Sequence, residues 1–416
     1  MERAEVLIVG GGPAGSACAT ALVAAGCSVL VVDQQRFPRD KPCAGWITPE
    51  VVERLGLRLD EYSRNHTLQP VSRFRIGTIG GRAADVDYGA IVSYGIRRSE
   101  FDVELLRRSA ARVALGERVS EIRRAGREWV LNGRLAAPVL VGAGGHFCPV
   151  ARHIDGAPPH EALVVAQEVE LRLEGALLEG CRVDPERPEL YFSRDLRGYG
   201  WCFRKGAYLN VGLGRRDRQT LQQQLEAFLA WLVREQRIVA PRAGWRGHAY
   251  LLREGAGRRV GADGVLLVGD AAGLAFAASG EGILPAIVSG QIAAESILET
   301  KDAAAEGALG RRYAERLAEQ LGRPARPRSR PGALAAAAGG VLLATPWFAR
   351  HVVLDRWFLH RQGAPQPRGR APSGHENQAG CCSAGAGVSA FAAALRRRRR
   401  ANHSRTVSGR RPSRYV

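Results

Sequence analysis

Three glycines near the start of the chain, Gly10, Gly12 and Gly15, have the spacing G-x-G-x-x-G, and Asp33 follows them. Glycine at these positions allows a tight turn, the close approach of a pyrophosphate, and the close packing of a helix on a strand. Free N–H groups at the helix start bind phosphate, and the Asp33 carboxylate can accept hydrogen bonds from a ribose diol. The spacing predicts a dinucleotide site made by Gly10, Gly12, Ala14, Gly15 and Asp33, although a glycine-rich turn without a ligand is the alternative.

Cys43 is a second candidate for chemistry, and it stands in the stretch RDKPCAGW, residues 39–46. The thiolate is the reactive form of cysteine, and the cationic Lys41 two positions earlier would favour it. A cysteine in a turn also packs as a small apolar side chain without a chemical role. Both interpretations stay open, and Cys43 is our candidate catalytic residue.

Three aromatic residues, Tyr199, Trp201 and Phe203, alternate along the stretch GYGWCFRK. Alternate residues of a β-strand point to the same side, so a strand here would carry one aromatic face. That face is either part of an apolar core or a wall that positions a flat or prenyl-like substrate, with the Trp N–H and Tyr O–H groups as polar handles. We assign the three residues to substrate binding.

The elements that position these residues follow from the pattern of apolar side chains. Residues 5–33 predict a strand, a glycine turn, a helix and a second strand, which is the arrangement that a dinucleotide site needs. Residues 162–175 alternate apolar and charged side chains and predict a strand of an antiparallel sheet with one buried face. The stretch GVLLVGDAAG (264–273), an apolar strand ending in Gly-Asp, and a helix of small residues after Pro285 return the chain to the first domain.

Length and composition are those of a globular protein of two domains, because the chain has 416 residues of which 45% are hydrophobic. Its 8 cysteines are scattered without a CxxC pair, so neither a metal site nor a disulfide framework is predicted, and a reducing cytoplasm fits best. The N-terminus lacks the basic and apolar regions of a signal peptide. No run of about 18 apolar residues predicts a helix that spans a membrane.

The net charge of +19 is unevenly distributed along the chain. Residues 363–416 hold 11 Arg and 1 Glu and few aromatic residues, so this segment cannot bury a core and we expect a disordered basic tail. The aromatic and basic stretch 345–361 predicts a closing helix, for which peripheral contact with a membrane is one role. No nucleic-acid motif accompanies the charge, and we expect no nucleic-acid partner.

Three separated elements resemble the large group of flavoproteins that contains the aromatic hydroxylases and the flavin halogenases. The first is the glycine fingerprint with Asp33, the second is VLVGAGGHFCPVAR (139–152), and the third is LLVGDAAG (266–273). In the second element Gly144 stands where the group has an aspartate. The resemblance implies non-covalently bound FAD, with Asp270 hydrogen-bonded to its ribityl chain.

Within this group, the sequence resembles the geranylgeranyl reductase family most. Four stretches carry this resemblance: a Lys-x-Cys-Gly-Gly-like turn at KPCAG (41–45), an Arg-x-x-Phe-Asp-x-x-Leu-like helix start at IRRSEFDVELLRRSA (96–110), a substrate-lining strand at GYGWCFRK (198–205), and a last cofactor segment at GEGILPAIVSGQIAAE (280–295). Ala44 and Arg204 depart from the family pattern, which has glycine and proline at these positions.

The resemblance also assigns residues to roles. It places Cys43 near the flavin, where the thiol would gate or protonate the substrate, and it assigns Gly282 and Ile283 to the cofactor. Arg98 stands at the arginine of the family's helix start, and its guanidinium matches phosphate oxygens. A solvated position on a helix is the alternative for Arg98.

The fold implied by the resemblance is α/β, with a Rossmann-type FAD-binding domain, an inserted antiparallel β-sheet substrate domain and a C-terminal helical region. The expected boundaries are 1–70, 95–155 and 260–300 for the FAD-binding domain, 71–94 and 156–259 for the substrate domain, 301–362 for the helical region, and 363–416 for the disordered tail.

The implied activity is reduction of a C=C bond in an apolar isoprenoid substrate of geranylgeranyl type, by hydride transfer from reduced flavin. A flavin monooxygenase or halogenase is one alternative, and a flavin-free binding protein is another. No second dinucleotide fingerprint is present, so the electrons would come from transiently bound NAD(P)H or from a ferredoxin-type donor protein. We expect a cytoplasmic protein, with peripheral attachment to a membrane as a further option.

Overall fold

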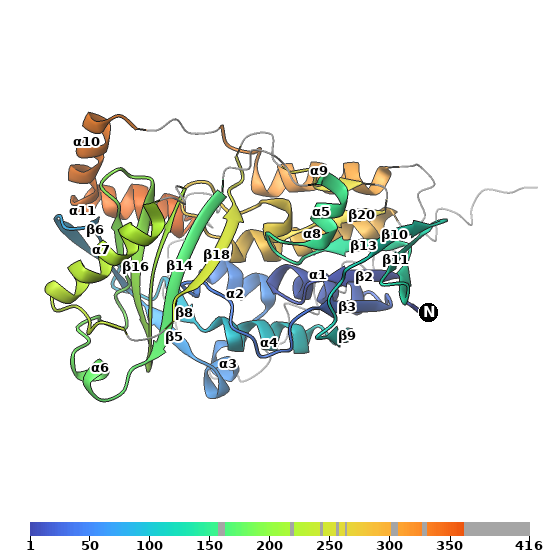
Figure 1. Ribbon diagram of the computed structural model, residues 1–416, viewed down its shortest axis with the longest axis horizontal. Helices are drawn as coiled ribbons and strands as arrows, with labels where there is room; N and C mark the ends of the chain where they lie inside the picture. The colour runs from blue at the N-terminus through green and yellow to red at the C-terminus, as the bar shows by residue number, and fades with distance from the viewer. Residues whose placement is uncertain are drawn as a thin grey trace, which may run out of the picture.

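The computed structural model describes residues 1–156, 163–216, 220–241, 244–254, 258–262, 264–300, 307–326 and 331–361. The basic tail expected at 363–416 lies outside the described residues. Figure 1 shows two sheet-based regions side by side, with C-terminal helices lying along both of them. One region is built on the N-terminal strands and the other on the long strands from the middle of the chain.

The first region is a six-stranded sheet in the order β19-β20-β13-β2-β3-β9. Neighbouring strands are parallel except for the edge pair β19 and β20. Its strands are β2 (Val6–Val9), β3 (Val29–Asp33), β9 (Arg112–Leu115), β13 (Val139–Gly142), β19 (Gly261–Ala262) and β20 (Val265–Leu267). The central strands are apolar along their whole length, as expected of a parallel sheet that is covered on both faces. The predicted Rossmann-type sheet is confirmed.

Two smaller sheets border this region. One has the order β1-β12-β11-β10, and the other has the order β4-β8-β5. Their strands are β1 (Glu2–Arg3), β10 (Ile122–Ala125), β11 (Glu128–Leu131), β12 (Leu135–Ala137), β4 (Trp46–Ile47), β5 (Leu68–Val71) and β8 (Ser93–Ile96). The Ile96 N–H donates to the Gly45 carbonyl at 2.7 Å, so the second small sheet holds the end of the turn that contains Cys43.

The second region is a seven-stranded sheet in the order β18-β14-β17-β16-β15-β6-β7. All neighbours are antiparallel except β15 and β6, so the sheet that we predicted to be antiparallel has one parallel pair. Its strands are β6 (Arg73–Thr78), β7 (Ala83–Asp87), β14 (Leu163–Arg172), β15 (Glu189–Phe192), β16 (Gly198–Lys205), β17 (Tyr208–Arg215) and β18 (Arg246–Leu251).

The described helices that accompany these sheets range from the 3 residues of α11 to the 18 residues of α8. The bounds are α1 (Pro13–Ala24), α2 (Pro49–Leu55), α3 (Leu59–Asn65), α4 (Arg98–Arg108), α5 (Pro149–Asp155), α6 (Ala176–Glu179), α7 (Leu221–Arg234), the 3-10 turn η2 (Gly269–Ala272), α8 (Ile283–Thr300), α9 (Ala308–Leu321), α10 (Ala333–Leu343), α11 (Pro346–Phe348) and the π-helical η3 (Ala349–Phe358). Helix α8 packs along α1, and α9 packs on α8.

The seven-stranded sheet has two different faces because its side chains alternate. One face, which includes Tyr191, Cys202 and Val211, packs under the apolar side of α7. The other face carries Tyr199, Trp201 and Phe203 and packs against η3. We name this second surface the aromatic face. The C-terminal segment therefore closes the side of the sheet on which we expected a substrate.

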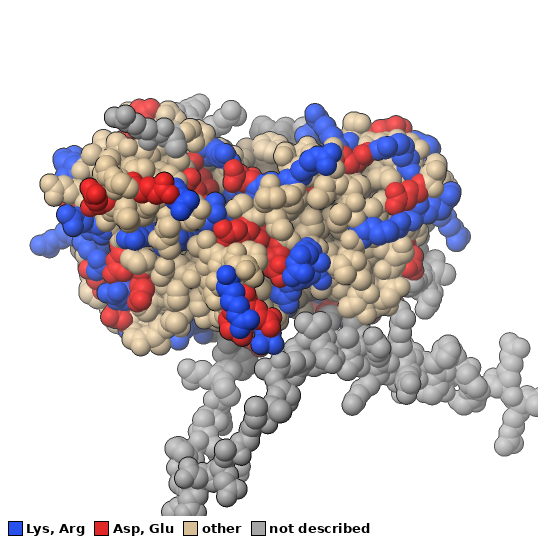
Figure 2. All heavy atoms as spheres, turned by 90° about the horizontal axis from the view of Figure 1, so that it is seen from below, with Lys and Arg blue, Asp and Glu red and all other residues tan. Residues whose placement is uncertain are grey.

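Positive and negative side chains are intermixed on the face of the molecule shown in Figure 2. Surface ion pairs of the protein include Arg58 with Glu61 and Arg107 with Glu104. None of the described helices is long and apolar enough to cross a membrane alone. Helix α10 together with residues 346–358 has the necessary length and composition, but this pair is bent by 89°.

Candidate functional site

The glycine turn lies where β2 passes into α1, and two of its glycines are required by close backbone contacts. Gly10 has φ of +116°, and a Cβ atom there would lie 2.3 Å from the Ala143 carbonyl oxygen. A Cβ atom on Gly15 would lie 1.9 Å from the Gly10 carbonyl oxygen. At Gly12 the nearest atom, Arg39 Nη2, would be 3.4 Å away. The first and third glycines thus allow the backbone to pack, whereas the second leaves space at the start of α1.

Two other sequence-predicted residues also lie at this turn. Ala14 is buried, and its carbonyl oxygen would be 2.2 Å from a Cβ atom on Gly290, so α1 and α8 touch through small residues. Asp33 ends β3, and its carboxylate accepts hydrogen bonds from the Gly11 N–H and the Gln35 N–H, both at 2.8 Å. A carboxylate accepts further bonds at its remaining lone pairs, so Asp33 is fixed in place and can still accept from a diol.

Arg98, which we assigned to phosphate, lies at the start of α4 and is buried together with its partner. Its guanidinium donates two hydrogen bonds of 2.8 Å to the Asp102 carboxylate. Arg39 forms an ion pair with the same carboxylate at 3.0 Å, so two guanidinium groups share one carboxylate and the cluster has an excess positive charge. Arg39 Nη1 is buried and has no hydrogen-bond partner among the described residues.

These features fit the phosphates of FAD. A buried guanidinium N–H without a partner costs free energy until it meets an acceptor. Arg39 lies beside Gly12, where the missing side chain leaves room, and the first N–H groups of α1 point out of the helix end. Arg39 is therefore the better candidate for a phosphate contact, and Arg98 positions the Asp102 carboxylate that holds it.

Asp270 lies in η2 and is part of a second polar cluster. Its Oδ2 lies 3.3 Å from His248 Nε2, and His248 Nδ1 lies 2.7 Å from Lys41 Nζ. Burial lowers the pKa of Lys41 to about 8, although Asp270 opposes this shift. Burial alone would raise the pKa of Asp270, but His248 and the cations Lys41 and Arg98 hold it below its usual value. Asp270 is therefore ionised at neutral pH.

Gly282 and Ile283 lie next to this polar cluster. A Cβ atom on Gly282 would be 3.2 Å from Asp270 Oδ1, and Ile283 is the first residue of α8. The structure thus brings Asp270, Gly282 and Ile283 together, as the resemblance to the flavoprotein family implies. It also adds Lys41 and His248, of which the first comes from the turn that contains Cys43.

The turn of residues 41–46 joins two hydrophobic cores. Cys43 packs against the core of the six-stranded sheet, whereas Ala44 and Trp46 pack against the aromatic face. Gly45 has φ of +69°, and a Cβ atom there would lie 2.1 Å from the Ile96 carbonyl oxygen. The turn therefore needs glycine at this position, and it stands at the junction of the predicted cofactor and substrate sides.

Lys205 fixes this turn from the end of β16. Its side chain is 1% exposed, and its ammonium group donates to the carbonyl oxygens of Ala44 and Ile96, both at 3.1 Å, and pairs with Glu170. A buried cation needs such partners to offset its loss of hydration. The Cys43 carbonyl accepts a further bond from the Asn210 amide at 3.3 Å, and the Gly45 N–H lies 3.4 Å from the Cys43 thiol sulfur.

Glu168 is a buried acid that lies against the same turn. It is on the aromatic face of β14, where the Cys43 backbone N–H and Asn210 interact with its carboxyl group. Its Oε2 has no hydrogen-bond partner among the described residues. Burial raises the pKa of Glu168 to about 7, and the Cys43 N–H opposes this shift. Glu168 can thus hold a proton at neutral pH close to Cys43.

Tyr199, Trp201 and Phe203 lie on one face of the sheet, as their spacing predicts, and in the described residues this face is filled. Phe358 of η3 stacks on Trp46 with ring centroids 5.2 Å apart and packs on Tyr199 at 5.6 Å. Tyr199 Oη donates to the Ser279 carbonyl at 2.6 Å, and Trp201 Nε1 donates to Asn210 Oδ1 at 2.7 Å. The two polar handles that we expected for a substrate therefore bind protein groups, because this face is covered by the C-terminal segment.

Sequence analysis missed Arg39, Glu168 and Lys205. Arg39 stands in the RDKPCAGW stretch that drew attention to Cys43, so its position was a usable signal. Glu168 is one of the charged side chains of the alternating stretch 162–175, and the sequence does not show that η3 and the Cys43 turn cover this side of the strand. Among the described residues, no group of three His, Cys, Asp or Glu side chains could hold a metal ion.

Comparisons with known proteins agree with this arrangement. Residues 3–91 match the family described as FAD binding domain. The chain is 31% identical over 326 residues to menaquinone reductase of Mycolicibacterium smegmatis, covering 70% of this chain and 76% of that protein. It is 30% identical over 364 residues to digeranylgeranylglycerophospholipid reductase of Methanothrix thermoacetophila, covering 77% and 85%. A geranylgeranyl bacteriochlorophyll reductase-like structure from Thermoplasma acidophilum has the same fold, with a TM-score of 0.65, 21% identity, and coverage of 83% and 88%.

Proposed function

Because this chain belongs to the geranylgeranyl reductase-like family of FAD-dependent oxidoreductases, we propose that it reduces a C=C bond in the isoprenoid chain of an apolar lipid. Menaquinone and digeranylgeranylglycerophospholipid, which name the relatives, both carry polyisoprenoid chains. The observation that carries the proposal is the position of the Cys43 turn. It joins the cofactor side of the molecule to the aromatic face.

The polar groups of the first domain would hold FAD. The start of α1 and the Arg39 guanidinium would hold the pyrophosphate, and Asp33 would accept hydrogen bonds from the adenosine ribose. Asp270 would hold the ribityl chain, and its contact with His248 keeps its carboxylate oriented. The chemistry that FAD would supply here is hydride transfer to one alkene carbon, so the protein must deliver a proton to the other alkene carbon.

The turn supplies that proton in our proposal. The Cys43 side chain is the candidate donor, and the Cys43 backbone N–H lies against the buried Glu168 carboxyl group, whose raised pKa lets it hold a proton at neutral pH. Lys205 and Asn210 hold the carbonyl groups of the turn, so the thiol has a fixed position. Fixed geometry at a proton donor raises the rate of transfer because no reorganisation is needed in the transition state.

The aromatic face orients the apolar chain. Tyr199, Trp201 and Phe203 offer flat apolar surface, and the same surface excludes water from the reacting carbons. In the described structure Phe358 occupies part of it, so a long substrate would displace or slide past the η3 side chains. The electron source stays a prediction, with NAD(P)H or a ferredoxin-type protein as the two options.

Anaerobic reoxidation of the reduced protein tests the proposal. The bound flavin is reduced with dithionite, and geranylgeranyl diphosphate, which has no quinone ring that could accept the electrons, is then added without oxygen. A reductase regains the absorption of oxidised flavin as the prenyl chain is reduced. If the flavin stays reduced until oxygen is admitted, the chain is a monooxygenase or halogenase and the proposal is wrong.

Substitution of the turn cysteine separates its two interpretations. Cys43→Ser keeps the size of the side chain but replaces a thiol by a far weaker acid. We expect unchanged FAD binding and a loss in kcat of about tenfold or more, since general acid catalysis contributes at least about a hundredfold in many enzymes. FAD absorbance and turnover are both measured, and unchanged turnover would leave Cys43 with a packing role alone.

A further inference from the structure

Helix α10 is apolar on all sides, yet most of it faces water. Its sequence, ALAAAAGGVLL, holds no polar side chain, and only Ala336 and Leu343 are buried. Leu334 is 89% exposed, Val341 is 69% exposed and Leu342 is 45% exposed. A helix that is apolar all round belongs in a protein core or in contact with lipid. Something other than the described part of the chain must therefore cover α10.

The side chains of α10 are arranged in the opposite way to those of an ordinary surface helix. Its small residues face the protein, because a Cβ atom on Gly339 would lie 2.6 Å from Leu196 Cδ1 and one on Gly340 would lie 3.5 Å from Thr78 Cγ2. Its large residues, Leu334 and Val341, point away from the protein. The glycines let the helix lie close to β6, at the outer edge of the molecule (Figure 1). The exposed Leu334 and Val341 therefore form an apolar ridge on this helix.

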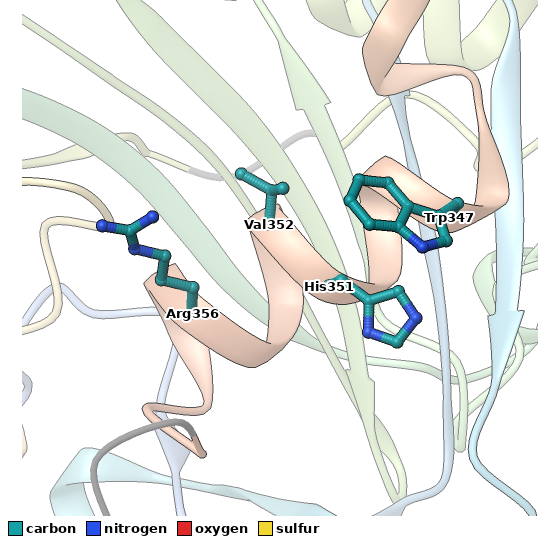
Figure 3. Close-up of a pocket in the computed structure, with 4 residues that line it drawn as sticks. All are labelled: Trp347, His351, Val352 and Arg356. Carbon is teal, nitrogen blue, oxygen red and sulfur yellow. The ribbon is translucent and has the colours of Figure 1, made fainter.

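The ridge continues around the bend that follows α10. Trp347 is 68% exposed, and it lines a surface hollow of about 440 Å³ together with His351, Val352 and Arg356. Figure 3 shows that all four side chains come from one continuous helical stretch. An indole beside a guanidinium and an imidazole is the combination found at the boundary between lipid chains and headgroups, where Trp and basic residues gather.

The sequence on both sides of α10 favours an anionic surface. No Asp or Glu occurs between Glu319 and Asp355, whereas this interval contains five arginines. Asp355 itself is partnered, because it accepts a hydrogen bond from Tyr88 Oη at 2.8 Å and pairs with His351. Arg356 is exposed and forms no ion pair among the described residues. The segment 363–416 adds 11 Arg and 1 Glu to the sequence that follows.

We propose that α10 and Trp347 form a docking surface for an anionic lipid bilayer. The apolar ridge enters the region between headgroups and acyl chains, and the arginines attract the anionic headgroups. A polar protein partner would leave the ridge uncovered, and a second copy of this chain would bring the same positive charges together. An anionic bilayer covers the apolar ridge with its acyl chains and neutralises the arginines with its headgroups.

The docking surface and the aromatic face share one segment. Residues 346–358 present Trp347 to the outside, while Phe358 packs on Trp46 and Tyr199 inside. Docking would thus place the cover of the aromatic face next to a membrane, from which a lipid with an isoprenoid chain could enter. This link to the substrate rests on the proposed function, whereas the docking itself does not.

Vesicle flotation of the full-length protein with bound FAD tests the docking. The vesicles contain phosphatidylcholine and phosphatidylglycerol, and the salt is raised to about 0.5 M so that long-range attraction by the arginines is screened. We expect the protein to float with the vesicles. The double variant Leu334→Asp and Val341→Asp should lower the partition coefficient by about tenfold or more, because two charges replace inserted apolar side chains.

The matched control is Leu178→Asp on α6, since Leu178 is an apolar side chain that is 43% exposed and lies at the opposite end of the sheet region from α10 (Figure 1). It should float as the unmodified protein does. The proposal is overturned if the unmodified protein does not float, if the double variant floats equally well, or if the protein is a dimer that the double variant dissociates.

Vesicles of brominated lipid give a local readout of the insertion of Trp347. They should quench Trp fluorescence less in Trp347→Phe than in the unmodified protein, and equal quenching would contradict insertion of Trp347. None of these readouts requires substrate reduction.

Discussion

The glycine turn at the start of α1 and the aromatic face of the seven-stranded sheet are specified in different ways. At the turn, backbone atoms touch: an added Cβ atom at Gly15 would lie 1.9 Å from the Gly10 carbonyl oxygen. At the aromatic face, side chains from distant segments touch, as Trp46 and Phe358 do with ring centroids 5.2 Å apart. The cofactor side is thus fixed by local backbone geometry, and the substrate side by contacts between residues far apart in the sequence.

The difference separates two tasks. Binding of a dinucleotide at such a turn needs a close approach of the backbone to the phosphates, so one short glycine pattern is sufficient to predict the site. A substrate is recognised by the shape of a surface, and that shape depends on which loop and which helix cover the sheet. Substitutions at the turn should therefore change both folding and FAD binding. Substitutions at the aromatic face should have smaller effects, and they should change stability without changing FAD binding.

The largest expected effect is that of Gly15→Ala. The added methyl group would overlap the Gly10 carbonyl oxygen, and neither backbone segment has room to move. We expect a loss of about 4 kcal/mol or more in the free energy of unfolding, and no retained FAD. The control is Gly12→Ala, where the nearest atom is the flexible Arg39 side chain at 3.4 Å. Urea unfolding should show a change within about 1 kcal/mol for this variant, with weaker FAD binding; equal losses would remove the distinction between the two glycines.

Glu168→Gln should change the pH dependence of stability on the substrate side. Burial raises the pKa of Glu168 from 4.5 to about 7, so the folded protein binds a proton more tightly than the unfolded chain. Its contribution to stability is full below pH 4.5 and is lost as the pH rises through about 7. This loss amounts to about 3 kcal/mol and is absent in the variant.

Unfolding at pH 5 and pH 8 measures this effect. The free energy of unfolding of Glu168→Gln, taken relative to that of the unmodified protein, should be higher at pH 8 than at pH 5. Glu128→Gln serves as the control, since Glu128 lies on the surface and pairs with the exposed Arg3. If the difference between Glu168→Gln and the unmodified protein is the same at both pH values, Glu168 is already ionised in the folded protein and does not hold a proton near Cys43.

A smaller effect is expected for Lys205→Met, which tests how the Cys43 turn is held between the two regions. The substitution removes the donor to the Ala44 and Ile96 carbonyls and leaves Glu170 with Arg97 as its partner. We expect a loss of about 2 kcal/mol in stability, less than for a fully buried pair because Glu170 is partly exposed. Combining it with Glu170→Met should recover part of the loss. If the double variant is no more stable than the single one, the ion pair is not what holds the turn.

The smallest effect is expected for Tyr199→Phe at the centre of the aromatic face. The ring and its contact with Phe358 remain, and only the hydrogen bond of 2.6 Å to the Ser279 carbonyl is lost. A buried hydrogen bond of this kind contributes about 1 kcal/mol. FAD binding should be unchanged, as measured by titration of the apoprotein. A clear loss of FAD affinity would mean that the two regions are less independent than we propose.

The same comparison explains what could be predicted from the sequence. The strand, turn, helix and strand of residues 6–33 were predicted because apolar period and glycine spacing are local signals. The face shared by Tyr199, Trp201 and Phe203 was predicted because strand alternation is local too. The burial of Glu168 and the covering of the aromatic face by Phe358 could not be predicted, because they depend on how residues 41–46 and 349–358 fold back onto the sheet.

Arg98 shows what a motif does not state. Its position in the α4 motif predicts a phosphate contact, which stays a prediction, and within the protein its guanidinium binds Asp102 four residues later with two hydrogen bonds. The motif thus contains both partners of an internal ion pair. The nearby Arg39, which the motif does not include, has a buried N–H group without a partner among the described residues.

The mass of the product formed without oxygen tests the central claim most directly. Protein with chemically reduced FAD is mixed anaerobically with geranylgeranyl diphosphate, and the prenyl product is analysed by mass spectrometry. The account predicts a gain of two hydrogen atoms in the isoprenoid chain for each flavin oxidised, and a slower gain with Cys43→Ser. An unchanged prenyl chain without oxygen, and a product that gains oxygen when air is admitted, would contradict it.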